Sequence, residues 1–285
     1  MKEIKIIESI YSVGRPREHI EDGHFIKLPF FGVIDGYSAP YNPFDEKNPL
    51  ILFDGMSGGE MARNTIQTMF SSADRDLNLE ITALQANELI GKEQKEYGFA
   101  LNNASYLAGA AAVLGKICQD QIILIQAGDC YAIWLYESGE IGITENKFYK
   151  FSLQGQEKFS GLLRKHQGNE LRIWQDYCCF LADLRQKHAN IDYPIFNGQP
   201  NVQECWQKIE LPLKSLKLLI LLSDGFINIE QMADEKRLAK DIVELFQSGQ
   251  SLNRVLVAAR AIEDMVNKDA HEKHAEATGL AIKFE

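Results

Sequence analysis

Cysteine is scarce in this chain, and its spacing argues against two common kinds of site. The 285 residues include five cysteines, an odd number, and no two of them are spaced as Cys-x-x-Cys. Neither a disulfide framework nor a zinc site built from thiolates is therefore indicated.

Long hydrophobic runs are also missing. The longest apolar run, around "LLILLS", is far too short to cross a bilayer. The start of the sequence, "MKEIKIIESI", lacks the long apolar core of a secretory signal. We therefore expect a cytoplasmic protein that does not associate with membranes.

Positive charge is in deficit, because 30 Lys and Arg residues face 40 Asp and Glu residues and give a formal net charge of -10. No cluster of Lys and Arg offers a local exception, so we do not expect nucleic acid to be held by its phosphates. Carboxylates gathered in one cleft would instead suit divalent cations. The sequence contains neither a Gly-x-Ser-x-Gly elbow nor a Gly-x-x-x-x-Gly-Lys-Ser/Thr loop, so no motif indicates a serine hydrolase or a P-loop nucleotidase.

The residues that are present predict one large domain over residues 1–285, since no linker, low-complexity tract or repeat divides the chain. Hydrophobic periodicity predicts strands at 4–13, 22–28, 30–35, 111–117, 121–136, 140–144, 217–223 and 278–284. It predicts helices at 58–73, 79–105, 156–187, 230–247 and 251–266. Strands that follow one another without intervening helices indicate an α+β fold of antiparallel sheets with helices packed outside.

Acidic residues stand next to four of these strands. Glu21 and Asp22 precede one strand, Asp35 ends the next, Asp129 lies in the turn of "AGDC", and Asp224 follows "LLILLS". Turn chemistry explains any single Asp-Gly pair. Several carboxylates at one sheet edge would repel one another and raise each other's pKa. A hard cation resolves that conflict, so the pattern indicates a metal site.

The order of these pieces resembles the metal-dependent PPM-type serine/threonine protein phosphatases, also called type 2C. Members carry an Arg before Glu-Asp, then Asp-Gly, Gly-Asp and Ser-Asp-Gly at strand ends, and Asp-Asn-x-Thr before the last strand. The matching pieces here are Arg17 four residues before Glu21, Asp35-Gly36 thirteen residues after Asp22, "GDCY" at 128–131, "SDG" at 223–225 and "AEATGLAIKF" at the end. The resemblance covers nearly the whole chain and implies an αββα sandwich of two antiparallel sheets flanked by helices on both sides.

The resemblance also implies a set of metal ligands. Two Mn²⁺ or Mg²⁺ ions would hold a water as the attacking hydroxide. Asp35 would bridge the two ions, the Gly36 carbonyl would bind one of them, and Asp224 would bind the other. Glu21 and Asp22 would act mainly through ordered water.

Two further residues take roles from the resemblance. Arg17 would grip the substrate phosphate with its planar fork of donors. Asp129 matches a residue linked to a third, weaker metal site. The implied function is hydrolysis of phosphoserine and phosphothreonine in proteins. Such a phosphatase would act in signalling, on proteins phosphorylated by a cognate kinase pathway. The alternative is a degenerate member that binds a phosphoprotein or regulatory partner without turnover.

Departures from the family pattern motivate that alternative. Tyr37 stands where the family has His or Met, and roughly twenty residues at 37–56 form an insertion beside the expected metals. The insertion contains a second Asp-Gly, which makes Asp54 a rival for the role of Asp35. Asn228 stands four residues after Asp224, at a position commonly acidic in the family.

The C-terminal departure concerns the second metal. Counting back from Thr278, the expected metal-binding Asp falls on Ala275 and its Asn neighbour on Glu276. Side chains alternate between faces in an extended segment, so we expect Glu276 to point away from the site. A local irregularity would instead turn Glu276 inward as a possible replacement ligand.

Overall fold

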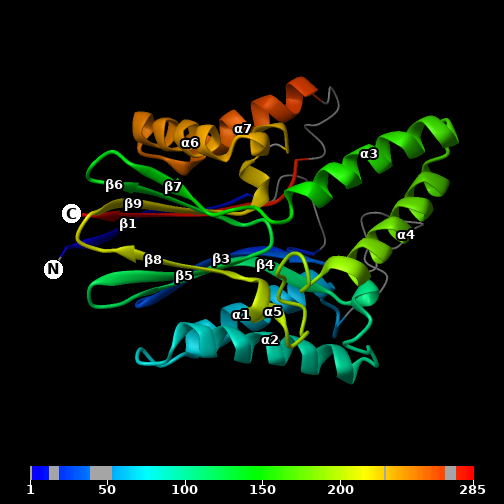
Figure 1. Ribbon diagram of the computed structural model, residues 1–285, viewed down its shortest axis with the longest axis horizontal. Coiled ribbons are helices and arrows are strands. Elements are labelled where there is room, and N and C mark those ends of the chain that lie inside the picture. The colour runs from blue at the N-terminus through cyan, green and yellow to red at the C-terminus, as the bar shows by residue number, and fades with distance from the viewer. Residues whose placement is uncertain (1, 13–18, 39–52, 228, 267–273) are drawn as a thin grey trace.

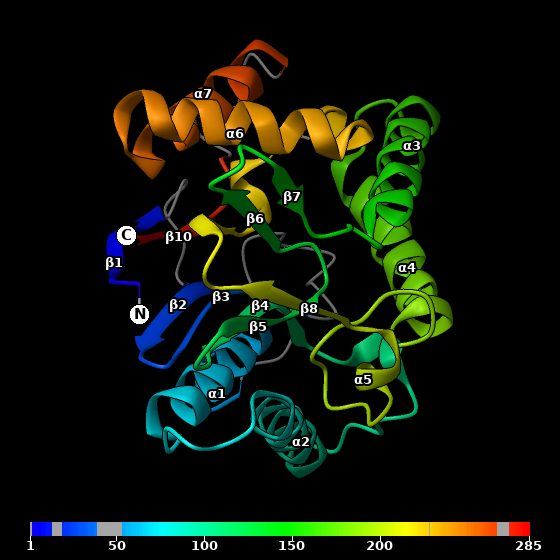
Figure 2. The ribbon, with the colours of Figure 1, turned by 60° about the vertical axis from the view of Figure 1, so that its left-hand side comes forward.

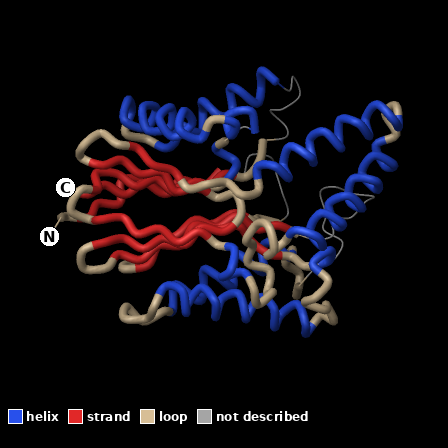
Figure 3. The backbone as a smooth tube through the Cα atoms, viewed as in Figure 1, coloured by secondary structure: helices blue, strands red, loops and turns tan. Residues whose placement is uncertain are grey.

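Two five-stranded antiparallel sheets lie face to face, with helices on both outer faces (Figures 1 and 3). The computed structural model describes residues 2–12, 19–38, 53–227, 229–266 and 274–285. The architecture is the αββα sandwich that the sequence predicts. The position of Arg17, most of the insertion and Asn228 lie outside the described residues.

The first sheet has the strand order β1-β10-β9-β6-β7. Its strands are Ile4–Ser12, Ala277–Phe284, Leu216–Leu222, Tyr131–Tyr136 and Ile141–Ile143. The second sheet has the order β2-β3-β4-β5-β8. Its strands are Asp22–Lys27, Phe30–Tyr37, Gly109–Ile117, Gln121–Ala127 and Gln207–Pro212. Both sheets are therefore built from segments that lie far apart in the sequence.

Strands β3, β4, β9 and β10 are buried on both faces, which explains why they read as nearly continuous apolar runs. In β3, Val33 joins the core between the sheets, and its neighbour Ile34 packs under helices α1 (Gly58–Ser72) and α2 (Leu79–Glu96). In β9, Leu221 faces the other sheet and Leu222 packs under α6 (Glu235–Gly249) and α7 (Leu252–Val266). Three hydrophobic layers therefore fix the register of the strands.

Helices α3 (Tyr149–His166) and α4 (Glu170–His188) form a hairpin that leans away from one end of the sandwich (Figures 1 and 2). The sequence predicts a single helix here, but the chain turns at Gln167 and Gly168, whose φ angles are 44° and 87°. The short helix α5 (Val202–Cys205) and the 3₁₀ turns Ala104–Tyr106, Asp224–Phe226 and Ile229–Ala233 complete the described helical segments.

Two other expectations are corrected. The helix predicted for 79–105 ends at Glu96, and Gly98 adopts a φ of 87°. The hydrophobic pattern did not predict strand β8, because its sequence, QKIELP, contains several polar residues and the strand lies at the edge of its sheet. In the described part of the chain, no helix combines the length and apolar character needed to cross a bilayer.

Candidate active site

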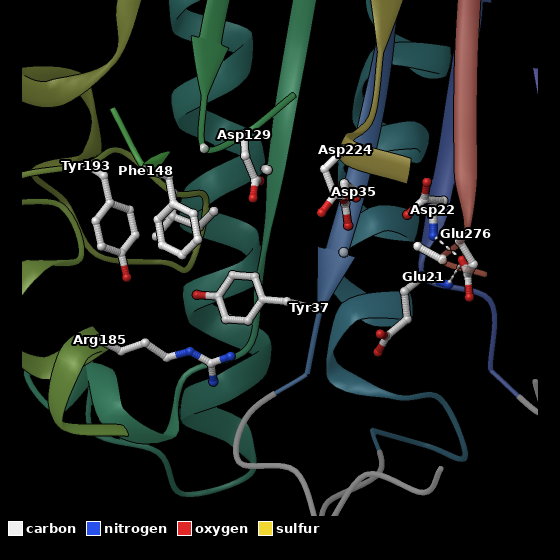
Figure 4. A pocket seen from close by; sticks show the side chains of 15 residues that line it. Glu21, Asp22, Asp35, Tyr37, Asp129, Phe148, Arg185, Tyr193, Asp224 and Glu276 are labelled. Carbon is white, nitrogen blue, oxygen red and sulfur yellow. Dashed lines mark hydrogen bonds between the residues drawn. The ribbon is translucent and has the colours of Figure 1, made fainter. Parts of the chain in front are cut away.

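The acidic residues that the sequence singles out meet in one cavity of about 310 Å³ (Figure 4). Asp22 and Asp35 are direct partners in the antiparallel pairing of β2 with β3. Asp129 follows β5 of the same sheet, and Asp224 follows β9 of the other sheet. The cavity is lined by Glu21, Asp22, Asp35, Gly36, Tyr37, Ala111, Gly128, Asp129, Phe148, Arg185, Tyr193, Ile195, Asp224, Ala275 and Glu276.

Burial and mutual repulsion raise the pKa values of these carboxyl groups. Burial raises the pKa of Asp22 well above its usual value, and the charge of Asp224 adds to the effect. The pKa of Asp35 is raised well above its usual value by burial and then by Asp22, Asp224 and Asp129. Burial, followed by the charge of Asp224, raises the pKa of Asp129 to about 7. Four aspartates therefore share a site that disfavours their combined negative charge.

Oxygen ligands of this kind fit Mg²⁺ and Mn²⁺, which are hard cations. In the described part of the chain, no group of three or more His, Cys, Asp or Glu side chains is arranged to hold a metal ion by itself. The donors present therefore fit ions that keep several waters and take one or two carboxylates each, which is the usual habit of Mg²⁺. A divalent cation would also offset the repulsion among the aspartates.

The backbone of Gly36 lies in close contact with the backbones of Gly59 and Glu21. A Cβ atom on Gly36 would lie 2.4 Å from the carbonyl oxygen of Gly59 in α1. The Gly36 N–H donates to the carbonyl oxygen of Glu21 at 3.1 Å. Only glycine fits at this point, so the end of β3 is held directly against the start of α1.

The Glu21 carboxylate joins the two ends of the predicted insertion. The hydroxyls of Ser38 and Ser57 both donate to its Oε1 atom, at 2.5 and 2.6 Å. Ser57 is also the N-cap of α1, because its Oγ accepts the N–H of Glu60 at 3.1 Å. The negative charge of Glu21 thus lies at the positive end of the α1 dipole, which stabilises it.

Glu276 points into the site, so the expectation that it turns away is wrong. Its side chain is only 4% exposed, and its Oε2 accepts the backbone N–H groups of Glu21 at 2.9 Å and Asp22 at 2.8 Å. Strand β10 begins at Ala277, so the alternation of an extended strand does not govern the preceding residues. Ala275 lines the same cavity, and its carbonyl oxygen accepts from the Arg260 guanidinium.

Asp54 lies apart from this cavity. Its side chain is exposed, its φ is 49°, and the hydroxyl of Tyr97 donates to its Oδ1 at 2.5 Å. The structure therefore places Asp35, and not its rival Asp54, beside Asp22 and Asp224. Ser223 supports the same group of residues, since its hydroxyl donates to Asp22 Oδ2 at 2.7 Å.

The opposite wall of the cavity is aromatic, and sequence reasoning missed most of it. The ring of Phe148 meets that of Tyr193 edge-on, with centroids 4.8 Å apart. Arg185, from the last turn of α4, stacks on Tyr37 with its guanidinium carbon 4.6 Å from the ring centroid. Burial raises the pKa of Tyr37 to about 12, an effect that the Arg185 charge partly opposes, so the phenol is neutral at pH 7. No motif marks these residues, and only Tyr37 stood out in the sequence, as a departure from a family pattern.

Comparison with known proteins identifies the fold. No protein-family model matches the chain. No curated protein matches it in sequence. The chain is similar, over 100% of its length in each case, to three solved structures. The first is the serine/threonine phosphatase Stp1 from Staphylococcus aureus, with a TM-score of 0.57, 14% identity and 96% of that chain covered. The second is PppA, described as a key regulatory component of the T6SS in Pseudomonas aeruginosa, with a TM-score of 0.56, 15% identity and 98% of that chain covered. The third is the catalytic domain of the serine/threonine phosphatase PstP in complex with two manganese ions, with a TM-score of 0.55, 14% identity and 99% of that chain covered.

Proposed function

We propose that this chain, which has the fold of the PPM-type serine/threonine phosphatases, removes phosphate from phosphoserine and phosphothreonine in proteins with the help of two Mn²⁺ or Mg²⁺ ions. The observation that carries the proposal is the meeting of Asp22, Asp35, Asp129 and Asp224 in one cavity. These acids come from both sheets, so turn chemistry at separate strand ends does not account for their convergence. The two manganese ions in the PstP structure support the choice of metal.

Acidic side chains and one backbone carbonyl of this chain would bind the metal ions. Asp35, Asp224 and the Gly36 carbonyl would hold the two ions, Glu21 and Asp22 would act mainly through ordered water, and Asp129 would border a third, weaker position. When bound, such ions supply Lewis acidity and lower the pKa of water, which makes a nucleophile available at neutral pH. Ionised aspartates are what the ions require, so metal binding and loss of the aspartate protons are linked.

Other side chains keep these ligands in place. The Ser223 hydroxyl fixes the orientation of the Asp22 carboxyl group. Glu276 holds the backbone at Glu21 and Asp22, and thereby sets where β2 begins. Arg17, as the clamp on the substrate phosphate, completes the proposal from the sequence resemblance alone.

A second candidate function is binding of a phosphoprotein without turnover. Ala275 favours it, because the side chain at this position contributes no oxygen to the cavity. In that case the protein would act within a kinase pathway as a partner of phosphorylated proteins.

Phosphate release from a phosphothreonine peptide distinguishes the two functions. We expect release in millimolar manganese, none after addition of chelator, and none from Asp224→Asn. Asp54→Asn is the matched control, since it makes the same change at an exposed aspartate outside the cavity and should behave like the parent. Absence of release by the folded parent at every manganese concentration would reject the enzyme and leave the binding function.

A further inference from the structure

The cavity contains a single basic side chain among its described lining residues. Six of those residues are acidic, namely Glu21, Asp22, Asp35, Asp129, Asp224 and Glu276, and Arg185 is the only Lys or Arg. The chain as a whole is also strongly acidic, with a net charge of -10. An anionic substrate is therefore repelled at long range, and the few local positive charges decide how it is seated.

Arg185 keeps its hydrogen-bonding edge available. The guanidinium lies over the face of Tyr37, which is the arrangement of a cation–π contact. Within the described residues, no carboxylate forms an ion pair with Arg185 and no hydrogen bond from its guanidinium is found, whereas the neighbouring Lys187 pairs with Asp183 at 2.7 Å. Stacking holds the plane of the guanidinium and leaves its fork of N–H donors for an anion.

Arg185 is also separated from the aspartates. In the view of Figure 4, the Tyr37 ring lies between Arg185 and the group of Asp35 and Asp224. The guanidinium carbon of Arg185 lies 4.6 Å from the centroid of that ring, so Arg185 is held on the side of Tyr37 that faces away from the aspartates. A phosphate seated at the aspartates would therefore leave Arg185 for a different anionic group.

We propose that Arg185 binds a second anionic group of the substrate, a carboxylate or phosphate carried by a residue that flanks the phosphoserine or phosphothreonine. The aromatic wall of Tyr37, Phe148 and Tyr193 packs against the peptide between the two anions. The protein then selects acidic or multiply phosphorylated peptides over neutral ones. This selectivity rests on the proposed function, because it places the first phosphate at the aspartates.

Binding of phosphopeptide analogues tests the proposal independently of turnover. Three fluorescent peptides carry the same non-hydrolysable phosphonate analogue of phosphothreonine, flanked by neutral residues, by aspartate or glutamate, or by a second phosphonate. Fluorescence anisotropy in manganese gives each dissociation constant. We expect both acidic peptides to bind about tenfold more tightly than the neutral one, since hydrogen bonds to charged groups contribute at least that factor.

Variants at Arg185 then locate the effect. Arg185→Ala should bring the ratio of dissociation constants close to one, and Arg185→Lys should keep part of the preference, because it retains the charge and loses the planar fork. Lys187→Ala is the matched control: it removes a positive charge from the same turn of α4 outside the cavity and should keep the full ratio. A melting curve for each variant checks that it is folded.

The outcomes separate this proposal from the proposed function. Equal binding of all three peptides by the parent, or a preference that survives in Arg185→Ala, would overturn the role of Arg185. Phosphate release from para-nitrophenyl phosphate, measured on the same preparations, reports the function separately. A preference that depends on Arg185 without any release would support the anion site and reject the hydrolase. If only one of the two acidic peptides is preferred, it identifies the anion as a carboxylate or a phosphate.

Discussion

The two walls of the cavity are built in different ways. The acidic wall comes from the ends of β-strands, where the pairing of β2 with β3 sets Asp22 opposite Asp35 and the packing of the sheets brings Asp224 close. Most of the aromatic wall comes from the α3–α4 hairpin and neighbouring loops, which supply Phe148, Arg185 and Tyr193, and the end of β3 adds Tyr37. Strand ends place side chains rigidly, which suits metal chemistry, whereas a helical hairpin outside the sandwich can vary without disturbing the sheets. If the proposed function holds, the acidic wall would determine the reaction and the aromatic wall would determine the choice of substrate.

Removing a ligand from the acidic wall should give the largest effect. Asp35→Asn keeps the shape of the side chain but removes its charge, and we expect manganese-dependent phosphate release to fall by more than about a hundredfold, beyond the range seen for partners that only orient ligands. Steady-state kinetics with para-nitrophenyl phosphate measure the loss. Activity within threefold of the parent would remove Asp35 from the metal site.

Glu276 should matter for stability as well as for the site. Glu276→Ala leaves two buried N–H groups without their acceptor, and we expect the free energy of unfolding to fall by about 1–3 kcal/mol. Glu276→Gln keeps an acceptor oxygen and should lose less. Urea denaturation measures both, and equal stability of Glu276→Ala and the parent would show that these hydrogen bonds contribute little.

Adding a carboxylate beside Glu276 should strengthen metal binding. Ala275 lines the cavity at the position where the family resemblance calls for an aspartate. Ala275→Asp adds a charged oxygen ligand, so the manganese concentration for half-maximal activity should fall several-fold. A manganese titration of the initial rate measures the change, and an unchanged or higher midpoint would place Ala275 outside the metal shell.

The aromatic wall should leave metal binding unchanged. Manganese at about a hundredfold excess over its dissociation constant stabilises the folded state by about 2.7 kcal/mol if it does not bind the unfolded chain. We expect the parent and Arg185→Ala to show the same manganese-dependent rise in melting temperature, measured by differential scanning fluorimetry. A smaller rise in melting temperature for Arg185→Ala would show that the aromatic wall also contributes to metal binding.

The sequence predicted the acidic wall better than the aromatic wall for a physical reason. Asp22 and Asp35 stand at a distance that suits a simple hairpin, so their pairing follows from local turn geometry and strand alternation. Phe148, Arg185 and Tyr193 meet only through tertiary packing of helices and loops, and no spacing in the sequence reports that packing. The register of Glu276 was wrong because alternation applies within a strand and β10 starts one residue later. Strand β8 was missed because its exposed edge position tolerates polar residues.

Anomalous diffraction from crystals grown in manganese locates bound ions without relying on activity, and so decides whether the acidic wall is a divalent-cation site. We predict two strong anomalous peaks in the cavity, within coordination distance of carboxylate oxygens of Asp35 and Asp224 and close to the Gly36 carbonyl. A weaker third peak would lie near Asp129. A cavity without anomalous peaks at saturating manganese, or peaks confined to surface carboxylates elsewhere, would contradict the claim that the acidic wall is a divalent-cation site.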